Sequence, residues 1–312
     1  MYTTRLPSPT PLSTRTAATP AGDGMKTAVA EPRGHRMLSL HLRWVTVLVT
    51  GAALYAAVLA ALLGTQDILY VPSLLLVGAA VVPVTFLTFV VGLRQRSELS
   101  FAQIVSAAAL GGMIGTVVAG TLEFETIRGL GSLPTVAIGV IEESAKLAIP
   151  AIVLIWRRPR PLDGLILGVA VGSGFAALET MGYAFVELVR SGGQLGSVTQ
   201  LLLLRSVTEP GGHAAWTGLA CAALFSIRTS SRRWLGWLRF FAVFLGVVAL
   251  HATWDSLATE TGYLLVGGAS FAMLMIVTWY LHRHDVARST PPSSRPAAES
   301  RTVLSGVSSA SQ

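Results

Sequence analysis

The side chains best able to do chemistry lie inside apolar stretches of this chain. Glu142, Glu143 and Lys146 fall within the apolar run 133–156, which at 24 residues is long enough to span a bilayer. An ionisable group at membrane depth costs about 2.5–3.5 kcal/mol on the insertion scale. Three such groups in one segment therefore indicate a function rather than a surface position.

More ionisable groups follow in later apolar segments. They are Glu179, Glu209, His213, His251 and Asp255. On a helix, residues three or four apart share a face, so Lys146 faces both glutamates of its segment and Asp255 can orient His251. The triplet 210–212, Pro-Gly-Gly, predicts a break between Glu209 and His213.

Glutamates with two histidines suit hydrolysis. A buried glutamate can act as general base on a water molecule, so Glu142 or Glu143 is the candidate base. A glutamate and two histidines are also a zinc ligand set, which makes Glu179, His213 and His251 candidate metal ligands. No HExxH motif is present, and the residues leave a zinc-dependent and a glutamate-only mechanism both open. No other cofactor is indicated.

Composition identifies the elements that must position these groups. The chain has 312 residues, of which 52% are apolar and 12% charged, and its mean hydropathy is +0.61. Soluble domains carry about 25% charged residues, so we expect an all-α, polytopic integral membrane protein with about eight transmembrane helices. The expected segments are 44–63, 71–93, 101–120, 133–156, 164–187, 206–227, 236–257 and 262–281.

The composition also divides the chain. Residues 1–42 are rich in Pro, Thr, Ser, Ala and Arg, and predict a disordered cytoplasmic N-terminal tail. Residues 43–282 form the expected transmembrane domain, with its motifs at about 130–260. Residues 283–312 are again rich in Arg, Ser and Pro, and predict a disordered cytoplasmic C-terminal tail.

The basic residues predict the orientation. With eight spans, 19 of the 23 lysines and arginines fall in the loops and tails on one side, and 3 fall on the other. This positive-inside pattern predicts a multi-pass protein of the cell membrane with both termini cytoplasmic. It also accounts for the net charge of +7, so the charge is not a nucleic-acid signal.

Depth and packing predict that four of the segments meet. Counted from the predicted segment ends, Glu142, Glu179, His213 and His251 all lie roughly 9–14 Å below the outer boundary. One shared layer predicts one site, in the outer half of the bilayer. The fifth segment carries a small residue at every fourth position from Gly164 to Ala184, which predicts a central helix that neighbouring backbones approach closely.

Four motifs occur in order on successive segments. Residues 142–146 match EExxK, residues 174–179 match GFxxxE, residues 205–213 resemble R…PxxH, and residues 251–255 match HxxxD. Together they resemble the PrsW family of intramembrane proteases, which is related to the CAAX prenyl-protease and bacteriocin-processing membrane proteins. The residue after the glutamate of the second motif is Thr180, where Asn is common in the family.

The resemblance implies peptide-bond hydrolysis in or beside the lipid bilayer, with essential paired glutamates. It implies a single-pass membrane protein as substrate, and in this family the known type of role is site-1-type cleavage of a membrane-anchored anti-sigma factor. The expected catalytic residues are Glu142, Glu143, Lys146, Glu179, His213, His251 and Asp255.

Two other classes of function compete with the protease. A proton- or ion-coupled transporter also uses membrane glutamates and broken helices. It would be expected to show an internal repeat that relates its two halves. No such repeat is seen, and the acids and histidines all lie in segments four to seven. A non-catalytic membrane scaffold on the same fold would be expected to have lost some motif residues, whereas all are present.

Overall fold

The computed structural model describes residues 42–93, 99–157 and 160–289, with side chains as far as His284. Every regular element in this part of the chain is helical, which confirms the all-α prediction. In chain order the elements are α2 (Arg43–Thr65), η1 (Ile68–Tyr70), α3 (Val71–Gly92), α4 (Phe101–Ser106), η2 (Ala107–Gly111), α5 (Gly112–Leu130), α6 (Thr135–Lys146), α7 (Ala148–Trp156), α8 (Pro161–Arg190), α9 (Leu195–Thr208), η3 (Glu209–Gly211), α10 (His213–Thr229), α11 (Arg233–Asp255) and α12 (Glu260–Ser289).

Six helices within the described residues are long and apolar enough to cross a membrane. They are α2, η1–α3, the continuous run from α4 to α5, α8, α11 and α12. They correspond to six of the eight predicted segments and make this a multi-pass membrane protein. The count of eight is not confirmed, because the predicted segments 133–156 and 206–227 are each interrupted.

The first interruption separates α6 from α7 at Leu147. Pro150 explains it, since proline has no N–H to donate to the carbonyl four residues earlier, that of Lys146. The predicted segment 133–156 is therefore two helices separated by one residue. Both paired glutamates lie in the last turns of α6.

The second interruption lies between α9 and α10. A helix begins at Leu195, eleven residues before the predicted start at 206, after a turn in which Gly192 and Gly193 adopt φ of 64° and 91°. Polar residues in the first turns of α9 lower its mean hydropathy, which is why the start was misplaced. The predicted break at Pro-Gly-Gly is confirmed: residues 209–211 form a 3₁₀ turn, and α10 begins at His213.

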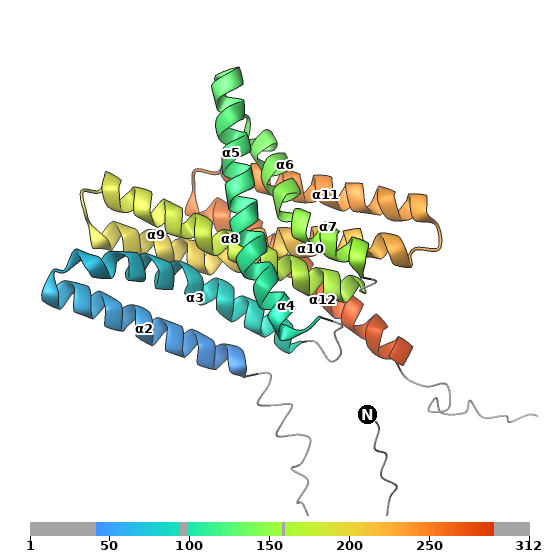
Figure 1. Ribbon diagram of the computed structural model, residues 1–312, viewed down its shortest axis with the longest axis horizontal. Helices are drawn as coiled ribbons and strands as arrows, with labels where there is room; N and C mark the ends of the chain where they lie inside the picture. Colours follow the sequence, from blue (N-terminus) through green and yellow to red (C-terminus); the bar gives the residue numbers. More distant parts are fainter. Residues whose placement is uncertain (1–41, 94–98, 158–159, 290–312) are drawn as a thin grey trace, which may run out of the picture.

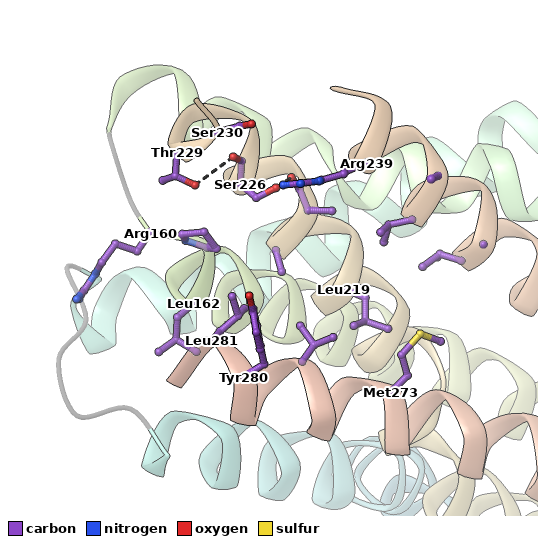
Figure 2. Close-up of a pocket in the computed structure, with 18 of the residues that line it drawn as sticks. Arg160, Leu162, Leu219, Ser226, Thr229, Ser230, Arg239, Met273, Tyr280 and Leu281 are labelled. Carbon is purple, nitrogen blue, oxygen red and sulfur yellow. Dashed lines mark hydrogen bonds between the residues drawn. The ribbon is translucent and has the colours of Figure 1, made fainter. Parts of the chain in front are cut away.

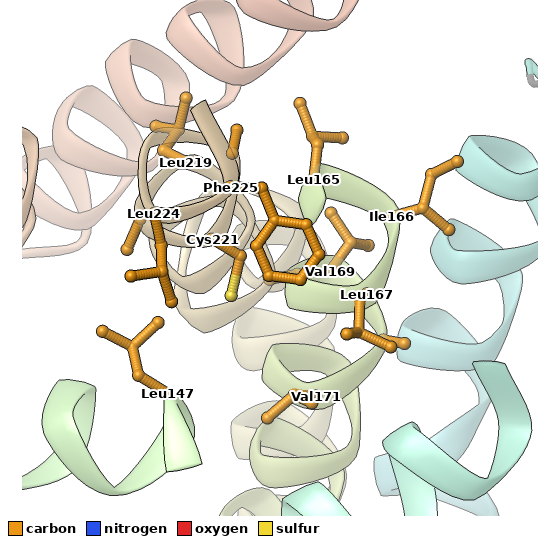
Figure 3. Packing of buried hydrophobic residues seen from close by; sticks show 14 of the residues in the cluster. Leu147, Leu165, Ile166, Leu167, Val169, Val171, Leu219, Cys221, Leu224 and Phe225 are labelled. Atoms are coloured by element: carbon orange, nitrogen blue, oxygen red, sulfur yellow. The ribbon is translucent and has the colours of Figure 1, made fainter. Parts of the chain in front are cut away.

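Helix α8 lies at the centre of the bundle, as the small-residue stripe predicts. A Cβ at Gly164, Gly168 or Gly172 would collide with a backbone carbonyl of α10. The two backbones therefore touch along the stripe, and the core fills around them. Figure 3 shows Phe225 and Cys221 of α10 packed against Leu165 and Val169 of α8.

Helix α5 crosses this bundle rather than running along it. In Figure 1 it stands steeply across α3 and α8. The crossing point is tight, since a Cβ at Gly112 would meet the backbone of Gly174 in α8. A π-helical turn, Ala107–Gly111, lies at the same place.

The expected tails, 1–42 and 283–312, lie almost wholly outside the described residues. Their disorder and their side of the membrane remain predictions. Helix α12 runs to Ser289.

Candidate active site

The ammonium group of Lys146 lies at the centre of a buried polar cluster. Its Nζ donates to Glu142 Oε2 at 3.0 Å and to Glu143 Oε1 at 2.8 Å. It also lies 2.6 Å from His213 Nδ1, and the ring of Phe175 covers it at 3.9 Å. Lys146 and Glu143 are completely buried. Three candidate catalytic residues therefore converge on one point, which a cation occupies.

His251 approaches the same two carboxylates from α11. Its Nδ1 lies 3.1 Å from Glu143 Oε1, and its Nε2 lies 3.5 Å from Glu142 Oε2. Asp255 Oδ2 is 3.6 Å from Nε2, so Glu143 is the nearer carboxylate. The predicted steering of His251 by Asp255 is an electrostatic contact here rather than a hydrogen bond.

His213 connects the cluster to a second carboxylate. Its Nε2 lies 2.9 Å from Glu179 Oε2, and the same oxygen accepts from Arg205 Nη2 at 2.5 Å. Arg205 Nε also donates to Thr180 Oγ1 at 2.7 Å. Because the Lys146 ammonium can only donate to Nδ1, the imidazole proton of neutral His213 is on Nε2 and is donated to Glu179.

Two side chains of α10, Trp216 and Thr217, contact His251 and Glu143 and fix their orientation. The Trp216 indole stacks on the His251 ring with centroids 4.8 Å apart, and its Nε1 donates to Ser270 Oγ on α12 at 3.0 Å. Thr217 donates to Glu143 Oε2 at 3.2 Å. Trp216 and Thr217 are fully buried, so the Glu143 carboxylate and the His251 ring are fixed in orientation.

The structure thus brings the predicted site residues of α6, α8, α10 and α11 together. Glu209 stands apart: it is buried, yet no bond to the cluster is described, and its Oε1 has no hydrogen-bond partner in the described part of the chain. The convergence is a structural fact, whereas the catalytic role of each residue remains a prediction.

Sequence reasoning missed four residues at the site. It included Arg205 in the R…PxxH motif but gave it no role at the site, because α9 was not recognised. It did not use Thr217, although Thr217 lies four residues after His213 and so shares its face. Nothing in the sequence distinguished Trp216 from an ordinary buried aromatic residue. Glu123 of α5 lies within electrostatic range of Glu142 and Glu179, and its acid character in an apolar helix was the available signal.

The residues present fit a metal ion. Ligand atoms of Glu142, His213 and His251 all lie within 4.8 Å of one another. Zinc bonds of about 2.0–2.2 Å place tetrahedral ligands about 3.4 Å apart, so the set would have to contract around the ion, and Lys146 Nζ, now 2.6 Å from His213 Nδ1, would have to move. The geometry groups Glu142, rather than the predicted Glu179, with the two histidines. Glu179 instead lies behind His213, where carboxylates orient metal-binding histidines.

Comparison with known proteins agrees with this chemistry. A model of the PrsW family of intramembrane metalloproteases matches residues 39–281. The chain belongs to the PrsW family. The match covers every described element of the site. Comparison with curated proteins and with solved structures gives no match.

Membership of the PrsW family makes the protein an intramembrane protease. Its substrates are proteins embedded in the bilayer, and the candidate active site is the buried cluster between α6, α8, α10 and α11. The buried Glu142, His213 and His251 group is compatible with a metal such as zinc.

Proposed function

We propose that this protein hydrolyses a peptide bond of a single-pass membrane protein near the extracytoplasmic face of the cell membrane. The observation that carries the proposal is the convergence of Glu142, Glu143 and His213 on one ammonium group. A water molecule or cation at that point would contact a base and two potential ligands at once. This is the arrangement that water activation needs.

Glu143 is the proposed general base. Its Oε2 is held by Thr217 at 3.2 Å, so the carboxylate cannot rotate freely. Its Oε1 points to the convergence point, where it lies 2.8 Å from Lys146 Nζ. In a glutamate-only mechanism the nearby His251 can then donate a proton to the leaving nitrogen or stabilise the developing oxyanion; in a metal-dependent one it is a ligand instead.

Glu142, His213 and His251 are the proposed metal ligands. A bound zinc ion would supply a Lewis acid for the attack of water on the scissile carbonyl. Glu179 accepts from His213 Nε2 and so leaves Nδ1 directed at the ligand cluster. Lys146 would have to leave this point for a divalent cation to bind there, because like charges repel.

The substrate and the face of cleavage come from topology and resemblance. The depth estimate places the cluster in the outer half of the bilayer if both termini are cytoplasmic. A single-pass protein whose helix ends near that face would bring its peptide bonds to this depth. Resemblance to the family's known role supports an anti-sigma factor as one such substrate.

A screen of single-pass membrane proteins tests the proposal. Candidates tagged at both ends are co-expressed with wild type, with Glu143→Gln, or with Glu125→Gln as the matched control. Glu125 is an exposed glutamate paired with Arg128 at 2.8 Å, so its loss leaves the site intact. We expect clipping with wild type and with Glu125→Gln, and none with Glu143→Gln.

Two outcomes would overturn the proposal. One is clipping by Glu143→Gln at the wild-type rate, provided the variant reaches the membrane in equal amount. The other is a clip on the cytoplasmic side of the substrate helix, which would refute the predicted face. Treatment with a chelator, followed by zinc, separates metal-assisted from glutamate-only hydrolysis.

A further inference from the structure

A cavity lies away from the active site, between α10, α11 and α12 and the first turn of α8. Its volume is about 1180 Å³. Figure 2 shows its lining, with Leu219, Met273 and Leu281 along the helices, Arg239 beside Ser226, and Arg160 at the far left. None of the proposed catalytic residues lines it.

The long wall of the cavity is apolar. It is formed by Leu219 of α10, Val243, Val247 and Leu250 of α11, and Val277 of α12, among others. Gly246 also lines it, and a Cβ there would meet nothing within 4 Å. The glycine therefore faces open space, and this wall suits a hydrocarbon chain.

One end of the cavity is polar and cationic. Arg239 is the lining residue of α11 nearest the start of that helix, and Tyr280 and His284, whose rings lie 4.3 Å apart, line it from the last turns of α12. Ser226 and Ser230 line it from the end of α10. Among the lining residues that the structure describes, none is acidic. This end lies where α10 ends and α11 begins, which is the predicted cytoplasmic boundary.

Arg160 also lines this end, but its charge is partly satisfied. Its Nε lies 3.5 Å from Asp163 Oδ2. The positive charge of the cavity therefore comes mainly from Arg239, for which no carboxylate partner is described, and His284 and Tyr280 add N–H and O–H donors. Arginine and hydroxyl donors together form a typical phosphate environment.

We propose that this cavity binds an anionic phospholipid of the cytoplasmic leaflet. The phosphate lies against Arg239, His284 and Tyr280, and an acyl chain extends along the apolar wall toward Leu250. Cationic pockets between transmembrane helices on the cytoplasmic side bind anionic headgroups in this way.

Charge favours a lipid over the helix of a substrate. The cytoplasmic flank of a membrane-spanning helix carries Lys and Arg, which the cationic end of the cavity would repel. An anionic lipid headgroup complements that charge.

The lipid would also contact the two helices, α11 and α12, that position His251 in the catalytic cluster. Leu250, at the inner end of the cavity, is the residue before His251. Leu219 is one turn from Trp216, which connects His251 to Ser270 on α12. A chain lying between α11 and α12 would therefore hold the two helices that position His251.

Native mass spectrometry of the full chain released from detergent tests the proposal. The protein is delipidated, then incubated with phosphatidylglycerol or with phosphatidylcholine of the same chain length. Variants are Arg239→Gln, which removes the headgroup charge, and Gly246→Phe, which fills the chain-binding space. Arg233→Gln is the matched control, because Arg233 is on the same helix but does not line the cavity.

We expect wild type and Arg233→Gln to retain phosphatidylglycerol more strongly than phosphatidylcholine. Arg239→Gln should reduce the preference by about fivefold, the effect of one arginine at an anionic surface. Gly246→Phe should reduce retention of both lipids. Inorganic phosphate should not compete, because it lacks the chain.

Equal retention of the two lipids by wild type would overturn the proposal, as would unchanged retention in both variants. Photo-crosslinking serves if a variant fails to fold. A photoactivatable phosphatidylglycerol should label peptides of α11 and α12 in wild type, and labelling confined to other helices would refute the site. Cleavage lost in Gly246→Phe with lipid retention unchanged would assign the cavity to the substrate helix instead.

Discussion

The orientation of the Glu179 carboxylate depends on Arg205, which lies on the neighbouring helix α9. Arg205 donates to it at 2.5 Å, and the same oxygen receives His213 Nε2 at 2.9 Å. The arginine therefore fixes the carboxylate that fixes the histidine. Outer groups of this kind are typically worth about 10–100-fold in metal affinity or activity.

Arg205→Gln should lower the cleavage rate by about 10–100-fold and weaken zinc binding by a similar factor. The reason is that Glu179 loses its charged partner and His213 loses its fixed orientation. Rate assays in liposomes and zinc titration measure both effects. Arg190→Gln, at the exposed end of α8, is the control and should change neither. Unchanged zinc affinity in Arg205→Gln would contradict the positioning role.

Lys146 should compete with a metal ion for the same place. The residue is fully buried, and its ammonium offsets the charges of Glu142 and Glu143. Removing one partner of a buried ion pair typically costs about 3–5 kcal/mol, because the other charge is left uncompensated. A zinc ion could replace that lost charge.

Lys146→Gln should therefore unfold at a lower temperature than wild type without metal, and zinc should raise its unfolding temperature more than that of wild type. Thermal unfolding in detergent, with chelator and then with zinc, measures this. Arg128→Gln removes an exposed cation and should leave the zinc effect as in wild type. A smaller zinc effect in Lys146→Gln than in wild type would show that the ammonium does not occupy the metal position.

At the scale of elements, α8 and α10 position the cluster by touching along the glycine stripe. Gly172 faces the backbone of His213, the first residue of α10. A methyl group there cannot be accommodated without moving a backbone, and overpacking of this kind costs about 1–3 kcal/mol. The position of His213 thus depends on a glycine about two turns before Glu179 on α8.

Gly172→Ala should lower stability and displace His213, with a loss of at least about tenfold in activity. Gly182→Ala is the matched control on the same helix, since its Cβ would meet nothing within 4 Å. That control should be neutral or slightly stabilising, because alanine favours the helix. Unfolding temperatures and cleavage rates check both; equal behaviour of the two variants would refute the close packing.

Some helices and helix breaks could be predicted from the sequence, and others could not. The central position of α8 and the break before His213 followed from glycine spacing and Pro210, which are local signals. The start of α9 could not be found by hydropathy, because its polar first turns resemble a loop. The contact of Arg205 with Glu179 was missed for that reason, since it exists only when α9 packs against α8.

At the scale of the whole molecule, charge and depth were the informative quantities. The charge alternation assumed eight crossings, of which six are continuous helices. The depth estimate brought together Glu142, Glu179, His213 and His251, and the structure places these side chains in one cluster. Depth in the membrane could not predict which atoms are in contact, because contacts also depend on the rotation of each helix about its axis and on side-chain rotamers.

Cysteine labelling tests the predicted orientation. Gln194→Cys lies in the exposed turn between α8 and α9 and should react with a membrane-impermeant maleimide added outside cells. Ser231→Cys lies between α10 and α11 and should react only after the membrane is opened. The native Cys221 is fully buried, so wild type is the unlabelled control. The reverse accessibility of the two sites would contradict cytoplasmic termini.

Purified protein in liposomes, given a membrane-anchored substrate in ¹⁸O-labelled water, tests the central claim most directly. Hydrolysis at this site predicts that wild type and Glu125→Gln release a fragment whose new carboxyl end carries the label, and that Glu143→Gln releases none. Product formed by Glu143→Gln at the wild-type rate, or a cleaved fragment without the label, would contradict water activation by the buried glutamate.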